Sequence, residues 1–174
     1  MHHWRISKYD DAKRDARGSY IEETWTSIHD IGKHFTGEQL TAAEYYRVEQ
    51  NYIGAALAFY SESASPTLRA VDVELGRRSP ELEEETSIPP FLREHQAILI
   101  ESLPDVLRAC LRESMWCRIE SDSGQFGIEF GYDYYMYVHS GQPCTRAIAR
   151  AKELGLFVEP RTSSYTAASG GPDG

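Results

Sequence analysis

The sequence has few cysteines, and they form no pattern that builds a disulfide framework or a zinc site. Cys110, Cys117 and Cys144 are the only three among 174 residues, an odd number. None belongs to a CxxC pair or follows histidines at zinc-ligand spacing. We therefore expect reduced thiols, a chain that folds without cross-links, and no metal site.

The common signatures of nucleotide-binding and hydrolytic enzymes are also missing. The sequence contains no Walker loop, no GxGxxG after a strand, no GxSxG elbow and no HExxH. We therefore expect no cofactor, and motifs alone assign no catalytic residue.

The chain lacks long hydrophobic runs. Its longest apolar stretch, Ala55 to Tyr60, is far short of the roughly 20 residues that a membrane-spanning helix needs. The residues from Met1 to Arg5 lead into charged residues rather than the apolar centre of a secretory signal. These features predict a cytoplasmic protein without membrane contact.

Basic residues are outnumbered, with 18 Lys and Arg against 27 Asp and Glu and a formal net charge of -9. Proteins that bind nucleic acid usually gather Lys and Arg on one face. The charge therefore disfavours a nucleic-acid partner and favours a basic protein partner.

Composition and length predict one α+β domain over residues 1–165. Hydrophobic residues make up 41% and charged residues 26%, which is ordinary globular usage. Residues 77–90 hold four glutamates between prolines and are predicted to be a mobile acidic loop, not a domain boundary. Residues 166–174 are predicted to be a flexible tail.

Three helices are predicted from caps and from apolar residues at three- and four-residue steps. The first runs from a capping box at Thr41 and Glu44 to about Ser61. The second begins at Ser102, with Pro104 in its first turn, and the third begins at Pro143 and ends at Gly155. The predicted core positions are Tyr45, Val48, Tyr52, Ala55, Ala56, Phe59, Leu103, Val106, Leu107, Cys110, Leu111, Ile148, Ala151 and Leu154.

The strands are predicted from period-two alternation and aromatic content. Residues 68–75 place Val71, Val73 and Leu75 on one face. Residues 115–119 and 126–130 form a hairpin, and 132–138 form a third strand, turned or bulged at Gly131. Shorter strands are expected at 4–9 and 156–158, and residues 25–35 are a loop or one helical turn. The predicted fold is a small, mostly antiparallel sheet, with a meander near the C-terminal half, packed against about three helices.

Three segments resemble a family of bacterial hypothetical proteins of similar length. They are WRISKYD at residues 4–10, ETWTSIHDIG at residues 23–32 and FGYDYYMY at residues 130–137. The resemblance covers most of the chain up to about Tyr165. It implies a bacterial cytosolic origin and one domain, and it assigns no catalytic residue.

The most distinctive local feature is Asp133 among tyrosines. Desolvation can raise the pKa of a carboxylate among aromatic rings, and phenol groups can orient a substrate, so an acid/base site is one interpretation. Period two places Tyr135 and His139 on the same side as Asp133. The alternative is that Asp133 caps a turn while the tyrosines pack both faces of the sheet. As a binding patch, the same region comprises Tyr132, Asp133, Tyr134, Tyr135, Tyr137 and Trp25, with Trp116 as a neighbour.

Two weaker candidates remain. His29 and Asp30, with His34 and Glu44, contain metal-ligand residue types, but a solvated histidine and an aspartate that initiates a helical turn explain the pair as well. Cys144 follows His139 by five residues at a predicted helix start, where a thiol pKa is lowered; the alternative is a small buried thiol.

These observations favour a non-enzymatic interaction protein. An acidic domain rich in tyrosine suits a basic partner, in the manner of small bacterial immunity proteins that bind toxins. The alternative is a small enzyme or small-molecule-binding protein with a pocket around Asp133.

Overall fold

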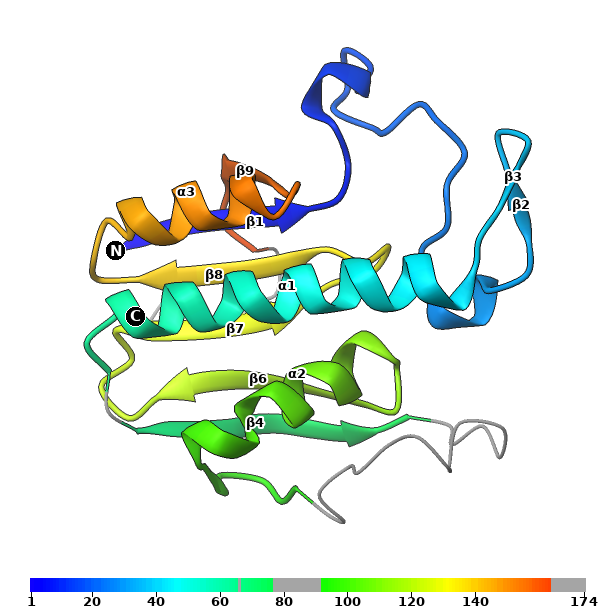
Figure 1. Cartoon of the computed structure of the whole chain (residues 1–174). Coiled ribbons are helices and arrows are strands. Elements are labelled where there is room, and N and C mark those ends of the chain that lie inside the picture. Colours follow the sequence, from blue (N-terminus) through cyan, green and yellow to red (C-terminus); the bar gives the residue numbers. More distant parts are fainter. Residues whose placement is uncertain (66, 77–91, 164–174) are drawn as a thin grey trace, which may run out of the picture.

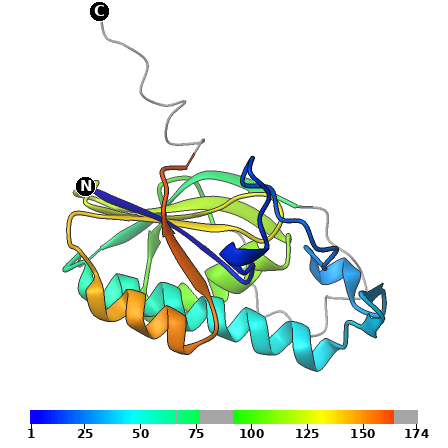
Figure 2. The same ribbon diagram turned by 90° about the horizontal axis from the view of Figure 1, so that it is seen from above.

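The computed structural model describes residues 1–65, 67–76 and 92–163. A seven-stranded sheet has the order β5-β4-β6-β7-β8-β1-β9, and every pairing is antiparallel. Three helices lie on one face of this sheet, and no helix covers the other face among the described residues (Figures 1 and 2). The predicted α+β fold is therefore confirmed.

The bounds of the elements follow the chain. The large sheet is built from β1 (His2–Ser7), β4 (Leu68–Leu75), β5 (Ala97–Ile98), β6 (Met115–Ser121), β7 (Phe126–Phe130), β8 (Met136–Ser140) and β9 (Phe157–Pro160). The helices are α1 (Ala42–Glu62), α2 (Leu103–Leu111) and α3 (Thr145–Glu153). A small hairpin joins β2 (His34–Phe35) to β3 (Glu38–Gln39), and short 3₁₀ turns lie at Asp11–Lys13, Ile28–Asp30 and Ile100–Ser102.

The long helix α1 forms where its cap and stripe predict it. The Thr41 hydroxyl accepts a hydrogen bond from the Glu44 N–H at 3.2 Å, while the Glu44 carboxylate pairs with Arg47 rather than with the cap backbone. Every predicted core position of α1 is buried. These side chains meet the inner face of the sheet, whose buried residues include Trp4, Ile6, Ala70, Ile119, Ile128, Met136 and Val138.

The prediction that Val71, Val73 and Leu75 share one face of β4 is wrong. Leu68 and Ala70 are buried, so alternation places Val71 on the opposite face, whereas Val73 packs against the core and Leu75 is 67% exposed. The strand pairing shifts between Val71 and Glu74, and Asp72 adopts a left-handed φ of 55°. A bulge adds one residue to a strand and so exchanges its faces, which period two alone cannot reveal.

The predicted strand over residues 132–138 is also partly wrong. Asp133 and Tyr134 have φ values of 58° and 62°, and two consecutive left-handed residues end an extended chain. Residues from Tyr132 to Tyr135 therefore form the turn between β7 and β8, closed by the Gly131 N–H donating to the Tyr135 carbonyl at 2.9 Å. The strand itself begins at Met136.

The remaining predictions differ in smaller ways. Pro143 precedes α3 instead of starting it, because Cys144 is a left-handed N-cap residue, and Gly155 ends the helix region with a φ of 77° as predicted. Residues 25–35 contain the one helical turn that was expected, but the β2–β3 hairpin was not predicted. The predicted acidic loop at 77–90 and the predicted tail at 166–174 lie outside the described residues.

Within the described parts of the chain, no helix is both long and apolar enough to cross a membrane.

A buried ion pair joins α1 to the end of α2. The Arg112 guanidinium donates to the two Glu49 carboxylate oxygens at 2.6 and 2.9 Å. The Glu49 side chain is only 1% exposed and the Arg112 side chain 7%. Such a bidentate pair satisfies both charges where water cannot.

We predict that Glu49→Ala lowers the free energy of unfolding by about 3–5 kcal/mol, because it leaves the Arg112 charge buried without its partner. Urea denaturation measures the change. Glu44→Ala is the matched control on the same helix: its partner Arg47 is exposed, so the loss should be about 1 kcal/mol or less. Equal losses in the two variants would contradict the role given to the buried pair.

Candidate functional site

The β7–β8 turn is held by two tyrosine hydroxyls from outside it. The Tyr52 hydroxyl on α1 donates to the Tyr134 carbonyl at 2.8 Å and accepts from the Lys8 N–H at 2.8 Å. The Tyr9 hydroxyl donates to the Asp133 carbonyl. A left-handed conformation is uncommon for a bulky residue such as Tyr134 and costs about 1–3 kcal/mol, so these contacts offset a local strain.

Two of the predicted binding residues belong to the core beneath this turn. The Tyr134 ring lies 5.1 Å from the Trp25 ring and 5.0 Å from the Tyr52 ring, in edge-to-face arrangements. Trp25 is 7% and Tyr134 6% exposed. Burial raises the pKa of the Tyr134 hydroxyl well above its usual range, so the phenol stays protonated.

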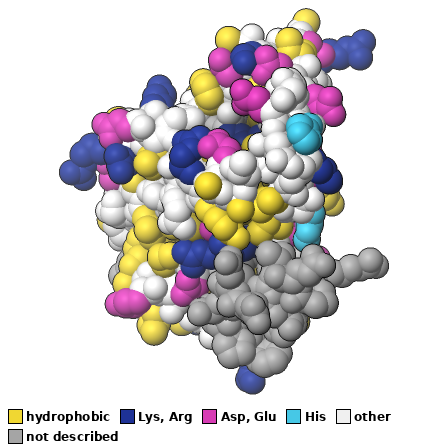
Figure 3. All heavy atoms as spheres, turned by 45° about the vertical axis from the view of Figure 1, so that its right-hand side comes forward, with side chains coloured by type: hydrophobic (Ala, Val, Ile, Leu, Met, Phe, Trp, Pro, Cys, Tyr) yellow, Lys and Arg dark blue, Asp and Glu magenta, His cyan; other side chains and the backbone are white. Residues whose placement is uncertain are grey.

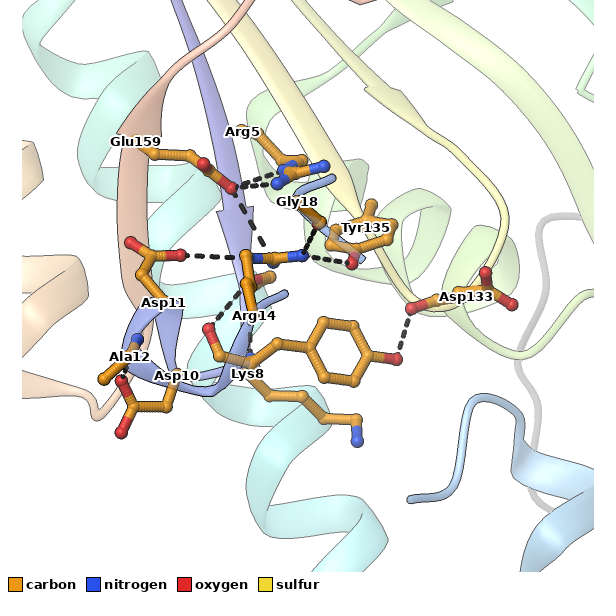
Figure 4. A network of polar contacts seen from close by, with 12 residues as sticks. Arg5, Lys8, Asp10, Asp11, Ala12, Arg14, Gly18, Asp133, Tyr135 and Glu159 are labelled. Atoms are coloured by element: carbon orange, nitrogen blue, oxygen red, sulfur yellow. Dashed lines mark hydrogen bonds and ion pairs between the residues drawn. The ribbon is translucent and has the colours of Figure 1, made fainter. Parts of the chain in front are cut away.

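Tyr135 lies in a polar cluster with two arginines (Figure 4). The Arg5 guanidinium stacks 4.6 Å from the Tyr135 ring centre, and Arg14 donates to the Tyr135 hydroxyl at 3.2 Å. Both guanidinium groups also contact the Glu159 carboxylate on β9. Because Arg14 also donates to the Gly18 carbonyl at 3.0 Å, this cluster fastens the segment after β1 to the sheet.

Tyr137 and His139 lie on the sheet face opposite the three helices. The His139 ring lies across Gly127 on β7, where the Cβ of any other residue would overlap it. Burial lowers the pKa of His139 to about 4, and the nearby His3 and Arg118 add to the effect. His139 is therefore neutral at physiological pH.

Asp133, Tyr135 and His139 do not surround one cavity. The alternation holds from Tyr135, just before β8, to His139 within it, but it does not extend back to Asp133, whose φ is positive. Asp133 lines a large cavity at one end of β8, whereas His139 lines a hollow of about 10 Å³ near the other end.

The large cavity, of about 640 Å³, is formed by segments that are distant in sequence. Buried apolar side chains of α2, β6 and β7 make its floor, and exposed acidic side chains stand at its edge. Its described lining residues are Thr26, Glu74, Leu75, Gly76, Cys110, Leu111, Glu113, Met115, Trp116, Phe130, Gly131, Tyr132, Asp133 and Tyr134.

The described lining of this cavity carries charge of one sign. Glu74, Glu113 and Asp133 are exposed carboxylates, and the described lining holds no Lys, Arg or His. Trp116 and the 83% exposed Tyr132 place aromatic rings beside them. Carboxylates with aromatic faces form a suitable environment for a cation. The face of the molecule shown in Figure 3 mixes both signs of charge around a central group of hydrophobic side chains.

Sequence reasoning identified Tyr132, Asp133 and Trp116, but it missed Glu74 and Glu113. Glu74 lies beyond the bulge of β4, and Glu113 follows the end of α2 with a φ of 57°. No local pattern connects these two glutamates with the β7–β8 turn. Only the pairing of β4 with β6 brings them to the same edge.

The other candidate sites have structural roles. The Asp30 carboxylate accepts from the Thr26 and Ser27 N–H groups at 2.9 and 3.1 Å and pairs with Lys33. It completes a capping box with the N-cap residue Ser27 and so stabilises the helical turn Ile28–Asp30. Within the residues that the structure describes, no group of three or more His, Cys, Asp or Glu is placed to hold a metal ion.

Of the two interpretations of Cys144, the buried thiol is confirmed. The thiol is only 1% exposed, and burial raises its pKa above the ordinary value. A raised pKa leaves little thiolate at neutral pH, so Cys144 is a buried apolar residue and not a nucleophile.

Comparisons with models of protein families, with curated proteins and with solved structures give no match. The resemblance to bacterial hypothetical proteins therefore stays a prediction.

We predict that Tyr52→Phe lowers the free energy of unfolding by about 1–3 kcal/mol, because it leaves the Lys8 N–H and the Tyr134 carbonyl without their shared partner. Urea denaturation followed by tryptophan fluorescence measures it. The control is Tyr20→Phe, whose hydroxyl bonds the exposed Glu22 at 3.3 Å and whose loss should cost about 0.5 kcal/mol or less. A Tyr52→Phe protein as stable as the control would show that the hydroxyl does not hold the turn.

Proposed function

We propose that this chain is a protein-interaction module that binds a basic partner by taking an Arg or Lys side chain of that partner into the 640 Å³ cavity. The observation that carries the proposal is the described lining, where Glu74, Glu113 and Asp133 surround an apolar floor without a basic residue. The floor would contact the aliphatic stem of the side chain, and the carboxylates would contact its charged end.

The rigidity of the turn supports this function. Asp133 is held by its backbone hydrogen bond to Tyr9, and the neighbouring Tyr134 is anchored in the core. A site held in place before binding loses less conformational entropy when the partner arrives. Strained residues of this kind are concentrated at binding and active sites.

The charge of the whole chain supports the same kind of partner. A formal net charge of -9 would attract a basic protein over a distance of about 8–10 Å at physiological salt and would repel nucleic acid. On this proposal, the protein acts in the bacterial cytoplasm. Its role would be like that of immunity proteins that bind basic toxins.

The alternative of a small enzyme at Asp133 has less support. Tyr135 is engaged with Arg5 and Arg14, and His139 lies at the other end of β8. Neither side chain is placed to exchange a proton with the Asp133 carboxylate in a shared pocket.

We predict that capped peptides with a central Arg or Lys between apolar residues bind this chain and quench Trp116 fluorescence, whereas the same peptides with a central Glu do not. The triple variant Glu74→Gln, Glu113→Gln, Asp133→Asn should weaken binding by roughly tenfold, since exposed charge pairs contribute about 0.2–1 kcal/mol each. Binding should also weaken as salt is added.

The control for this experiment is a second triple variant with the same change in net charge. Glu38→Gln, Glu101→Gln and Glu153→Gln replace exposed carboxylates outside the described cavity lining. It should bind the peptides nearly as the parent protein does. If both triple variants lose affinity equally, only the net charge matters and the cavity is not the binding site.

A further inference from the structure

A second cavity, of about 220 Å³, lies between the segment after β1 and helix α1. Lys8 lines it, together with the aromatic residues Tyr9, Tyr20 and Trp25 and the charged residues Glu44 and Arg47. The Lys8 ammonium nitrogen lies 4.1 Å from the Trp25 ring centre and 4.4 Å from that of Tyr9. It donates to the Thr24 hydroxyl at 3.1 Å.

Lys8 differs from the other three lysines of the chain. Lys13 pairs with Glu22 at 2.9 Å and Lys33 pairs with Asp30 at 2.7 Å, each near the surface, and Lys152 is exposed. No carboxylate pairs with Lys8 among the described ion pairs. Its amine is instead enclosed by rings at the wall of a cavity.

We propose that Lys8 is a nucleophilic lysine that forms an imine with a small aldehyde entering this cavity. The neutral amine attacks the aldehyde carbon, and a carbon–nitrogen bond forms. The carbonyl oxygen then leaves as water with both amine protons, so that a carbon–nitrogen double bond remains and no oxidant is needed. The cavity is smaller than the sites that hold drug-sized ligands, which limits the aldehyde to a few carbon atoms.

The surroundings of Lys8 favour the neutral amine that this step requires. Burial lowers the pKa of Lys8 to about 7, and it outweighs the opposing effect of the Asp30 and Glu44 carboxylates. The aromatic rings of Trp25 and Tyr9 act in the opposite direction, because they favour the ammonium form. Two further polar residues, Arg47 and Tyr20, also line the cavity. About half of the Lys8 side chains are then neutral near pH 7, against a very small fraction for a lysine of ordinary pKa.

The test is reductive trapping with glyoxylate and cyanoborohydride on the intact folded chain. Digestion and mass spectrometry then give the rate of modification at each of the four lysines, with the Met1 α-amine as a positive control. We expect Lys8 to react at least about tenfold faster than Lys13, Lys33 and Lys152 at neutral pH. Its rate should rise with a midpoint near pH 7, while theirs should rise near pH 10.

Two further measurements separate a reactive lysine from a structural one. Glu44→Gln removes a carboxylate that raises the pKa of Lys8, so the midpoint should move to lower pH. In denaturant, Lys8 should react no faster than the other lysines. The proposal is overturned if the folded chain modifies Lys8 no faster than Lys152, or if the midpoint for Lys8 lies near pH 10.

Discussion

The turn between β7 and β8 is the constraint on which the candidate site depends. Asp133 and Tyr134 are both left-handed, and each such residue costs about 1–3 kcal/mol. The hydroxyls of Tyr9 and Tyr52 fix the two carbonyls of this strained pair, and the Tyr134 ring fills the core. Because the chain reverses here, neighbouring residues have opposite roles: Tyr134 is interior, Tyr132 is at the cavity, and the sheet resumes with Met136.

The sequence predicts most of the fold because the large elements have strong, local patterns. The α1 stripe and the β6–β7 hairpin each repeat one period over many residues, and the structure confirms them. The errors lie where a single backbone angle overrides the pattern. Asp72 exchanges the faces of β4, and Asp133 delays the start of β8. Aspartate tolerates a left-handed φ better than most residues, but only a few aspartates in proteins adopt it. The presence of an aspartate alone therefore does not predict a bulge.

The candidate site was only half predictable for a different reason. Tyr132 and Asp133 stand out in the sequence because they are adjacent, whereas Glu74 and Glu113 come from other elements. The antiparallel pairing of β4 with β6 places them beside Trp116. Which strands pair is a long-range property of the fold. Because the walls of the cavity come from four separate segments, its residues have no fixed sequence spacing that a motif could reveal.

The sheet face opposite the helices shows that charge on this protein is organised locally rather than by its total. Glu129, Tyr137, Arg5 and Glu159 lie side by side across four strands, since each is the registered partner of the next. Glu129 is 5% exposed, and burial raises the pKa of its carboxyl to about 7. A carboxyl that is partly neutral at physiological pH adds little to the attraction of a basic partner. On the proposed function, the exposed carboxylates at the large cavity, with no described basic residue among them, would therefore direct such a partner more than the net charge does.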